Sequence, residues 1–123
     1  MYGDTEVMRR RAAELREQGV DLRTLADRLV ARTAAVGWTG RAAASLDERI
    51  RVRASHLRDV ASRHDDAAEA LDAHLREVDR LTEAIAAIER RARALRADGR
   101  LLPGFTPPPP GHRDWLAVEL PGR

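Results

Sequence analysis

The sequence predicts an all-α fold: an antiparallel helical hairpin with a long second helix, which assembles with a partner into a dimeric four-helix bundle. Apolar residues recur at intervals of seven along two stretches, and the short sequence Gly-Trp-Thr-Gly at residues 37–40 separates them. A sustained heptad repeat keeps one stripe of a helix facing a neighbour along its whole length. Hydrophobic residues make up 43% of the chain but aromatic residues only 3%. Because much of the apolar content is Ala, we expect a thin, seam-like core.

The first helix is expected over about residues 5–36 of a hairpin domain spanning residues 1–98. Asp4 and Thr5 are its candidate N-caps. Gly19 costs about 1 kcal/mol in a helix interior, but the heptad phase continues past it. We therefore expect a continuous or mildly bent helix in which Gly19 allows a partner backbone to approach closely. One heptad row carries the large residues Met8, Leu15, Leu22, Leu29 and Val36. A second row carries Ala12, Gly19, Ala26 and Thr33.

Residues 37–40 are expected to form the turn, and the second helix is expected over about residues 41–98. Gly37 can end the first helix in the left-handed conformation, and either Thr39 or Gly40 would cap the second. Gly99 marks the end of the second helix. The large apolar residues of this helix follow steps of three and four for most of its length: Leu46, Ile50, Leu57, Val60, Leu71, Leu75, Val78, Leu81, Ile85, Ile88 and Leu95.

The second helix is longer than the first, which predicts an apolar overhang. If the hairpin pairs symmetrically about Thr39, Met8 lies near Ala70, and the second helix continues for about 28 residues, or some 40 Å. Burying the large apolar side chains of this overhang is worth roughly 10–20 kcal/mol, similar to the net stability of a whole domain. A partner chain is the simplest cover, and a fold-back at Asp65-Asp66 into a three-helix bundle is the alternative. The expected partner interface comprises Leu15, Leu22, Leu29, Ile50, Leu57, Leu71, Leu75, Val78, Leu81, Ile85 and Ile88.

A Pro-rich tail follows at residues 99–123. Its four consecutive prolines, Pro107 to Pro110, cannot be helical. Two states of the tail remain open: it is disordered, or it docks through Phe105, Trp115 and Leu120.

The charge pattern is typical of solvated helix surfaces. All 22 basic residues are Arg, and 20 acidic residues are interspersed among them, for a net charge of +2. Nucleic-acid binding would call for a clustered basic stripe, so we expect no nucleic-acid partner. The chain has no Cys and therefore no disulfide or thiolate metal site. No apolar stretch reaches the length of a membrane span or a signal-peptide core, which predicts a soluble chain without a membrane span.

Catalysis, cofactor binding and metal binding are not expected. His56, His64, His74 and His112 lack the companion His at i+3 or i+4 that forms a metal pair on a helix. No Gly-rich elbow surrounds a Ser, and no phosphate-binding Gly loop exists. His64 falls in the apolar heptad row, where we expect a partly buried seam residue; a pH-sensing position is the alternative.

The sequence Gly-Trp-Thr-Gly-Arg-Ala-Ala-Ala at residues 37–44, with Leu46 and Arg49 beyond it, resembles the turn of the WXG (ESAT-like) family. Members of that family are small helical-hairpin substrates of bacterial type VII (ESX) secretion. The resemblance covers about residues 8–95. It implies that Trp38 and Gly40 contribute to recognition by the secretion ATPase. It also implies a protein made in the cytoplasm, paired with itself or a paralogous hairpin protein, and exported by type VII secretion.

The chain departs from the family pattern at its tail. Family members or their partners carry Tyr-X-X-X-Asp/Glu just beyond the second helix, whereas the single Tyr of this chain is Tyr2. Trp115 and Glu119 have that spacing and are the candidates for a tail signal; otherwise a partner supplies it. The chain is also longer than the usual member of this family. Its overhang and Pro-rich tail indicate a specialised form, such as an adaptor that pairs with a larger effector. The rival interpretation is a cytoplasmic coiled-coil scaffold or regulator whose Pro-rich tail is a docking ligand.

Overall fold

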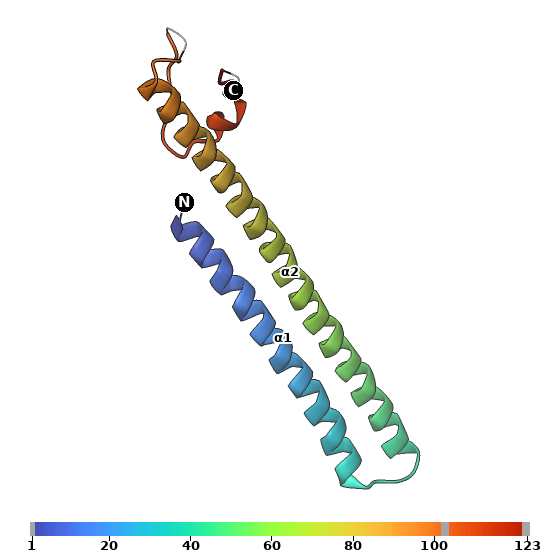
Figure 1. Ribbon diagram of the computed structural model, residues 1–123. Helices are drawn as coiled ribbons and strands as arrows, with labels where there is room; N and C mark the ends of the chain where they lie inside the picture. Colours follow the sequence, from blue (N-terminus) through green and yellow to red (C-terminus); the bar gives the residue numbers. More distant parts are fainter. Residues whose placement is uncertain (1, 102–103, 122–123) are drawn as a thin grey trace. The chain divides into compact units, whose positions relative to one another are not determined.

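A computed structural model describes residues 2–101 and 104–121, with only the backbone described for Tyr2 and Gly3. The elements are α1 (Tyr2–Val36), α2 (Arg41–Ala97) and a short 3-10 helix, η1 (Arg113–Ala117) (Figure 1). No strand occurs in the described ranges. The prediction of an all-α fold with a helical hairpin is confirmed.

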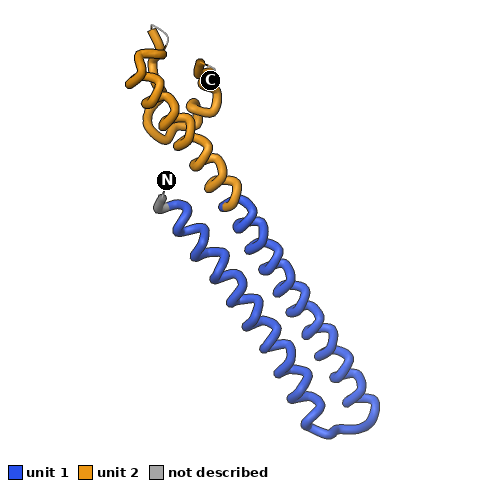
Figure 2. Tube along the Cα trace, viewed as in Figure 1, with its two compact units in different colours: residues 1–75 blue, residues 76–123 orange. Residues whose placement is uncertain are grey.

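The chain divides into two compact units, residues 1–75 and residues 76–123 (Figure 2). The first unit contains α1 and the part of α2 that lies beside it, and the second contains the remaining turns of α2 with the tail. Because α2 continues as one α-helix from Arg41 to Ala97, Asp65 and Asp66 lie inside a helix. The alternative of a fold-back at these two residues is therefore wrong.

Glycines end α1 and begin α2. Gly37 has φ +70° and Gly40 has φ +100°, values in the region that residues with a Cβ rarely adopt. The carbonyl of Gly40 accepts the N–H of Ala44 at 3.0 Å, which makes Gly40 the N-cap of α2. At its other end α1 begins at Tyr2, so Asp4 lies in the first turn instead of capping it. A carboxylate there still suits the positive end of the helix.

A Schellman motif ends α2. The N–H of Arg100 donates to the carbonyl of Leu95 at 2.8 Å, and the N–H of Gly99 donates to the carbonyl of Arg96 at 3.0 Å. Gly99 adopts φ +69°, the left-handed conformation that this motif requires. The helix therefore stops where the sequence indicates, and the chain leaves it in a new direction.

The two helices of the first unit meet along a small-residue seam: Ala12, Gly19 and Ala26 of α1, and Ala54, Ala61 and Ala68 of α2. All six are buried, and the five alanines are at most 1% exposed. Small side chains let two helix backbones approach more closely than large ones do. A Cβ added to Gly19 would lie 3.3 Å from the carbonyl oxygen of Ala61 and 3.0 Å from a carboxylate oxygen of Asp65. The close backbone approach expected at Gly19 is confirmed, and the partner backbone is α2 of the same chain.

Ion pairs join the helices on one side of this seam. They are Arg16–Asp72, Arg23–Asp65 (2.6 Å) and Asp27–Arg58 (2.9 Å). The bond to Asp72 raises the pKa of Arg16, which stays charged. Exposed pairs of this kind contribute about 0–1 kcal/mol each, so their main effect is to fix the register of the hairpin.

The backbone register is close to symmetric pairing about Thr39: that pairing puts Gly19 near Asp59, and a Cβ on Gly19 would lie 3.3 Å from the carbonyl oxygen of Ala61. The ion pairs are offset further, since symmetric pairing would put Arg16 near Ser62, but Arg16 reaches Asp72. Side chains on a helix lean toward its N-terminus. In an antiparallel hairpin those of α1 lean away from the turn and those of α2 lean toward it, so contacts join α1 to α2 residues farther from the turn. The hairpin unit extends to Leu75, which is 5% exposed and which the sequence analysis placed in the overhang, because α1 begins at Tyr2 and is longer than expected.

A large side chain at Gly19 should separate the two helices. We expect Gly19→Leu to lower the free energy of unfolding of the hairpin by about 1–3 kcal/mol, the usual cost of overpacking. Urea titration followed by circular dichroism measures it. The matched control is Ala13→Leu, at an exposed position of the same helix, which should change stability by no more than about 0.5 kcal/mol. Equal effects of the two substitutions would contradict close packing at the seam.

Candidate recognition surface

Trp38 is exposed at the tip of the hairpin. A turn tryptophan could simply cover the ends of the two helices, but 68% of Trp38 is accessible to solvent, so it does not act as such a cover. Gly37 and Gly40 flank the Trp38-Thr39 pair, and a Cβ at either glycine would meet nothing within 4 Å. The glycines are therefore needed for their backbone conformation, which in turn fixes how Trp38 is presented.

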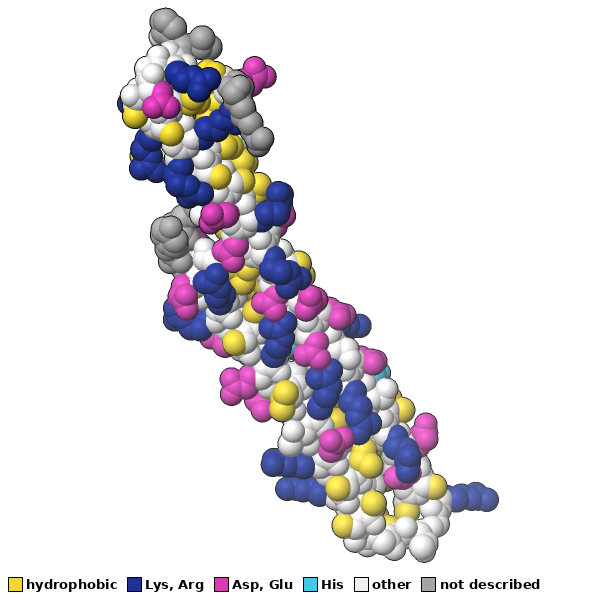
Figure 3. All heavy atoms as spheres, in the orientation of Figure 1, with side chains coloured by type: hydrophobic (Ala, Val, Ile, Leu, Met, Phe, Trp, Pro, Cys, Tyr) yellow, Lys and Arg dark blue, Asp and Glu magenta, His cyan; other side chains and the backbone are white. Residues whose placement is uncertain are grey.

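Two further apolar residues accompany Trp38, and together they form what we call the turn patch: Val36 (52% exposed), Trp38 and Leu46 (39% exposed). The patch lines a hollow of about 490 Å³ between the end of α1 and the start of α2. Figure 3 shows hydrophobic side chains gathered at this end of the hairpin, while Arg and acidic side chains are interspersed along the rest of the face in view. Contiguous exposed apolar residues that include an aromatic ring mark interaction sites on small proteins.

A second apolar surface follows the side of the hairpin away from the ion pairs. Residues four places after a seam residue, such as Arg16 and Asp65, form the ion pairs. Residues three places after a seam residue, such as Leu22 and Leu57, point about 100° away from them, because each residue turns the helix by about 100°. We call this surface the apolar flank: half-buried Leu15, Leu22, Leu29, Ile50, Leu57 and Leu71, with exposed Leu25, Leu46 and Val60.

The apolar flank contains six of the residues predicted to contact a partner, and it adds Leu25, Leu46 and Val60, which the sequence analysis did not assign to an interface. The positions of Leu25 and Val60, six places after Gly19 and Ala54, would have identified these two once the seam was known. His64 also lies in this row. It is half-buried, as expected, and its Nδ1 is 2.8 Å from the carbonyl oxygen of Val60.

The other predicted interface residues differ in their burial and in the unit to which they belong. Leu75 is buried in the first unit, and Val78 and Leu81 are half-buried in the second. Ile85 is 8% exposed and forms a core with Ala92 and Trp115, against which Ile88, Phe105, Val118 and Leu120 pack. The tail of the chain therefore covers Ile85 and Ile88.

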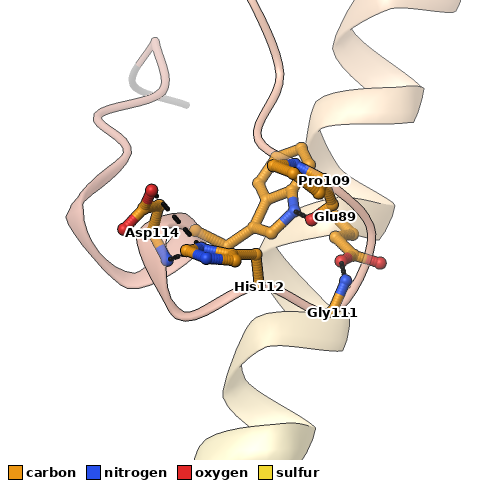
Figure 4. A network of polar contacts seen from close by, with 6 residues as sticks. Glu89, Pro109, Gly111, His112 and Asp114 are labelled. Carbon is orange, nitrogen blue, oxygen red and sulfur yellow. Dashed lines mark hydrogen bonds and ion pairs between the residues drawn. The ribbon is translucent and has the colours of Figure 1, made fainter.

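The tail is docked, which is one of the two states left open by the sequence. Trp115 is 5% exposed, and its indole N–H donates to the carbonyl of Pro109 at 3.0 Å. The N–H of Gly111 donates to the carboxylate of Glu89 on α2, and His112 caps η1 by accepting the N–H of Asp114 at 3.1 Å (Figure 4). These bonds fix the polyproline segment and η1 against the end of α2. Trp115 is thus buried and hydrogen-bonded, whereas Glu119 is exposed.

Sequence reasoning did not identify Glu89 as an anchor of the tail. It also did not identify Arg91, whose guanidinium donates to the carbonyl of Pro121 at 2.7 Å. A charged residue on a helix carries no sequence signal for bonding to the backbone of a distant loop. The side chain of Tyr2, the one tyrosine, lies outside the described residues.

The resolved pKa shifts belong to exposed surface pairs. Hydrogen bonds to Arg80 lower the pKa of Glu77, and the same pairing raises the pKa of Arg80; Asp47 likewise raises the pKa of Arg51. In the described part of the chain, no three His or acidic side chains are grouped so that they could hold a metal ion. None of the helices over the described residues is both long and apolar enough to cross a membrane.

Comparisons with known proteins do not assign the chain to a family: no family model, curated protein or solved structure matches it.

Replacing Trp115 with Ala should release the tail. The substitution removes the central side chain of the second unit, and such core truncations cost about 3–5 kcal/mol. We expect the amide of Gly111 and the amides of η1 to lose protection in a hydrogen-exchange experiment. Leu116→Ala, at a 42% exposed neighbour, is the control and should leave protection in place. Unchanged protection in Trp115→Ala would show that the tail is held by something other than this core.

Proposed function

We propose that this protein is a non-enzymatic substrate or adaptor of type VII secretion, and that it displays Trp38 and Gly40 to the secretion ATPase. The observation that carries the proposal is the exposure of Trp38 on a turn whose shape two left-handed glycines determine. Tryptophan is among the residues that contribute most to binding at interfaces, and Trp38 is accompanied by the exposed side chains of Val36 and Leu46. The resemblance of residues 37–44 to the WXG turn is the reason that the proposal names the secretion ATPase as the protein that binds Trp38.

The proposal includes a dimeric four-helix bundle formed through the apolar flank. One side of the hairpin is closed by ion pairs, whereas the other carries an apolar surface from Leu15 to Leu29 on α1 and from Ile50 to Leu71 on α2, interrupted on α2 by His64. Side chains at such heptad positions pack between the helices of four-helix bundles. In this proposal a second copy, or a paralogous helical-hairpin protein, covers this surface, with or without a larger effector attached.

The second part of the export signal comes from the partner in this proposal. Trp115 has the spacing to Glu119 of the family signal, but its ring is packed against Ile85 and Ala92. A buried indole cannot be read by a receptor while the tail is docked. The exposed turn patch is therefore the part of the signal that this chain displays itself.

A scaffold or regulator with a Pro-rich docking tail is the second candidate. It is favoured by the exposure of Pro107, Pro109 and Pro110, since exposed polyproline is a ligand for aromatic-lined grooves. Export separates the two candidates, because a scaffold stays inside the cell that makes it.

Trp38→Ala tests the proposal. The substitution removes an exposed side chain, so helix content and unfolding free energy should stay within about 0.5 kcal/mol of the parent. Export from a host with an active type VII system should fall to background, as measured by the ratio of secreted to cell-associated protein. The matched control is Val20→Ala, which truncates another exposed apolar residue of the hairpin (59% exposed) and should be exported normally. Normal export of Trp38→Ala would contradict the proposal, and absence of export for the parent chain would favour the scaffold.

A further inference from the structure

Four arginines crowd the last turns of α2, and the structure divides them into two pairs. Arg90 forms an ion pair with Glu83 at 3.7 Å, and Arg91 donates to the carbonyl of Pro121. The guanidinium groups of Arg93 and Arg96 have no acidic or hydrogen-bond partner among the residues that the structure describes. The negative end of the helix favours cations in its last turn, which accounts for Arg96. This effect does not account for Arg93, which lies about one turn earlier.

Arg93 and Arg96 line a groove of about 530 Å³ between α2 and the docked tail. One wall is the segment Pro107 to Pro110, and Phe105, Ala92 and Trp115 supply apolar surface. This volume falls within the range of roughly 300–1,000 Å³ that is usual for binding pockets. Its combination of apolar walls with a few charged groups at fixed positions is also usual for such pockets.

We propose that this groove binds an acidic peptide segment that carries an aromatic side chain. Guanidinium groups three residues apart on one helix lie on the same face, and each matches a carboxylate with two parallel hydrogen bonds. The aromatic side chain would pack against Phe105 and the prolines while flanking carboxylates pair with Arg93 and Arg96. The site lies wholly within the second unit and is independent of the turn patch.

The charge and the shape of the groove together favour a peptide over a small anion. Around the groove, residues 89–101 contain five arginines against Glu89 and Asp98, and Glu89 already accepts the N–H of Gly111. A phosphate ion could pair with the arginines but would leave the apolar wall in contact with water. An acidic peptide with an aromatic residue satisfies the charges and also buries the wall.

Trp115 lines the groove and reports on its occupancy. The chain has two tryptophans, so Trp38→Phe leaves Trp115 as the single tryptophan of the full-length protein, and selective excitation of tryptophan then reports on it alone. The probe is the peptide acetyl-Asp-Glu-Phe-Glu-Asp-amide, titrated at low salt, with acetyl-Asn-Gln-Phe-Gln-Asn-amide as the neutral counterpart. We expect saturable changes in Trp115 fluorescence with the acidic peptide, binding at least about tenfold weaker for the neutral one, and weakening with added salt.

The decisive variant is Arg93→Gln with Arg96→Gln, in the same Trp38→Phe background. It should weaken binding of the acidic peptide by about tenfold or more, because it removes the charged hydrogen bonds. The matched control is Arg10→Gln with Arg63→Gln, which changes net charge equally at exposed positions of the first unit. No fluorescence change at millimolar peptide, equal binding by both double variants, or equally tight binding of inorganic phosphate would each overturn the proposal.

Discussion

The close contact between Gly19 and the backbone of α2 is the constraint on which the hairpin depends. A glycine and alanines between the helices leave no room for large side chains in the seam. The residues that follow each seam residue by three places, which are five leucines and His64, are therefore displaced to one side, where they are only half-buried. The same geometry brings Arg16 and Arg23 to acidic residues on the other side. Such a hairpin has ion pairs on one side and half-buried apolar side chains on the other. The apolar side is therefore the surface on which a partner would bind.

In the second unit, the apolar residues of α2 are covered by the chain's own tail. The tail and the last turns of α2 form a small core centred on Trp115. Polar anchors hold the tail at several points, including Glu89 and Arg91. Because the tail covers Ile85 and Ile88, the surface available to a partner is concentrated on the apolar flank of the first unit. The docked tail also creates the groove that Arg93 and Arg96 line.

Features encoded locally could be predicted from the sequence. The heptad rows predicted both helices, Gly37 and Gly99 predicted where they end, and Gly40 was one of two candidates for the start of α2, because these signals depend on a few neighbouring residues. Symmetric pairing about Thr39 came close to the backbone register, but it did not predict which side chains pair across the helices, because that depends on the lean of the side chains on both. Among the candidate site residues, Trp38 could be singled out by its position in the turn, but its exposure could not. The burial of Trp115 depends on contacts with residues more than twenty positions away, which no local pattern encodes.

The central claim is that the seam leaves an apolar flank that a second chain covers. The most direct test is the mass of the purified chain in solution by light scattering, with a melting curve by circular dichroism on the same sample. The account predicts a helical species of about 27.4 kDa, twice the 13.7 kDa of one chain. A species of 13.7 kDa that melts in one cooperative transition would contradict it, because such a hairpin would be complete without a partner.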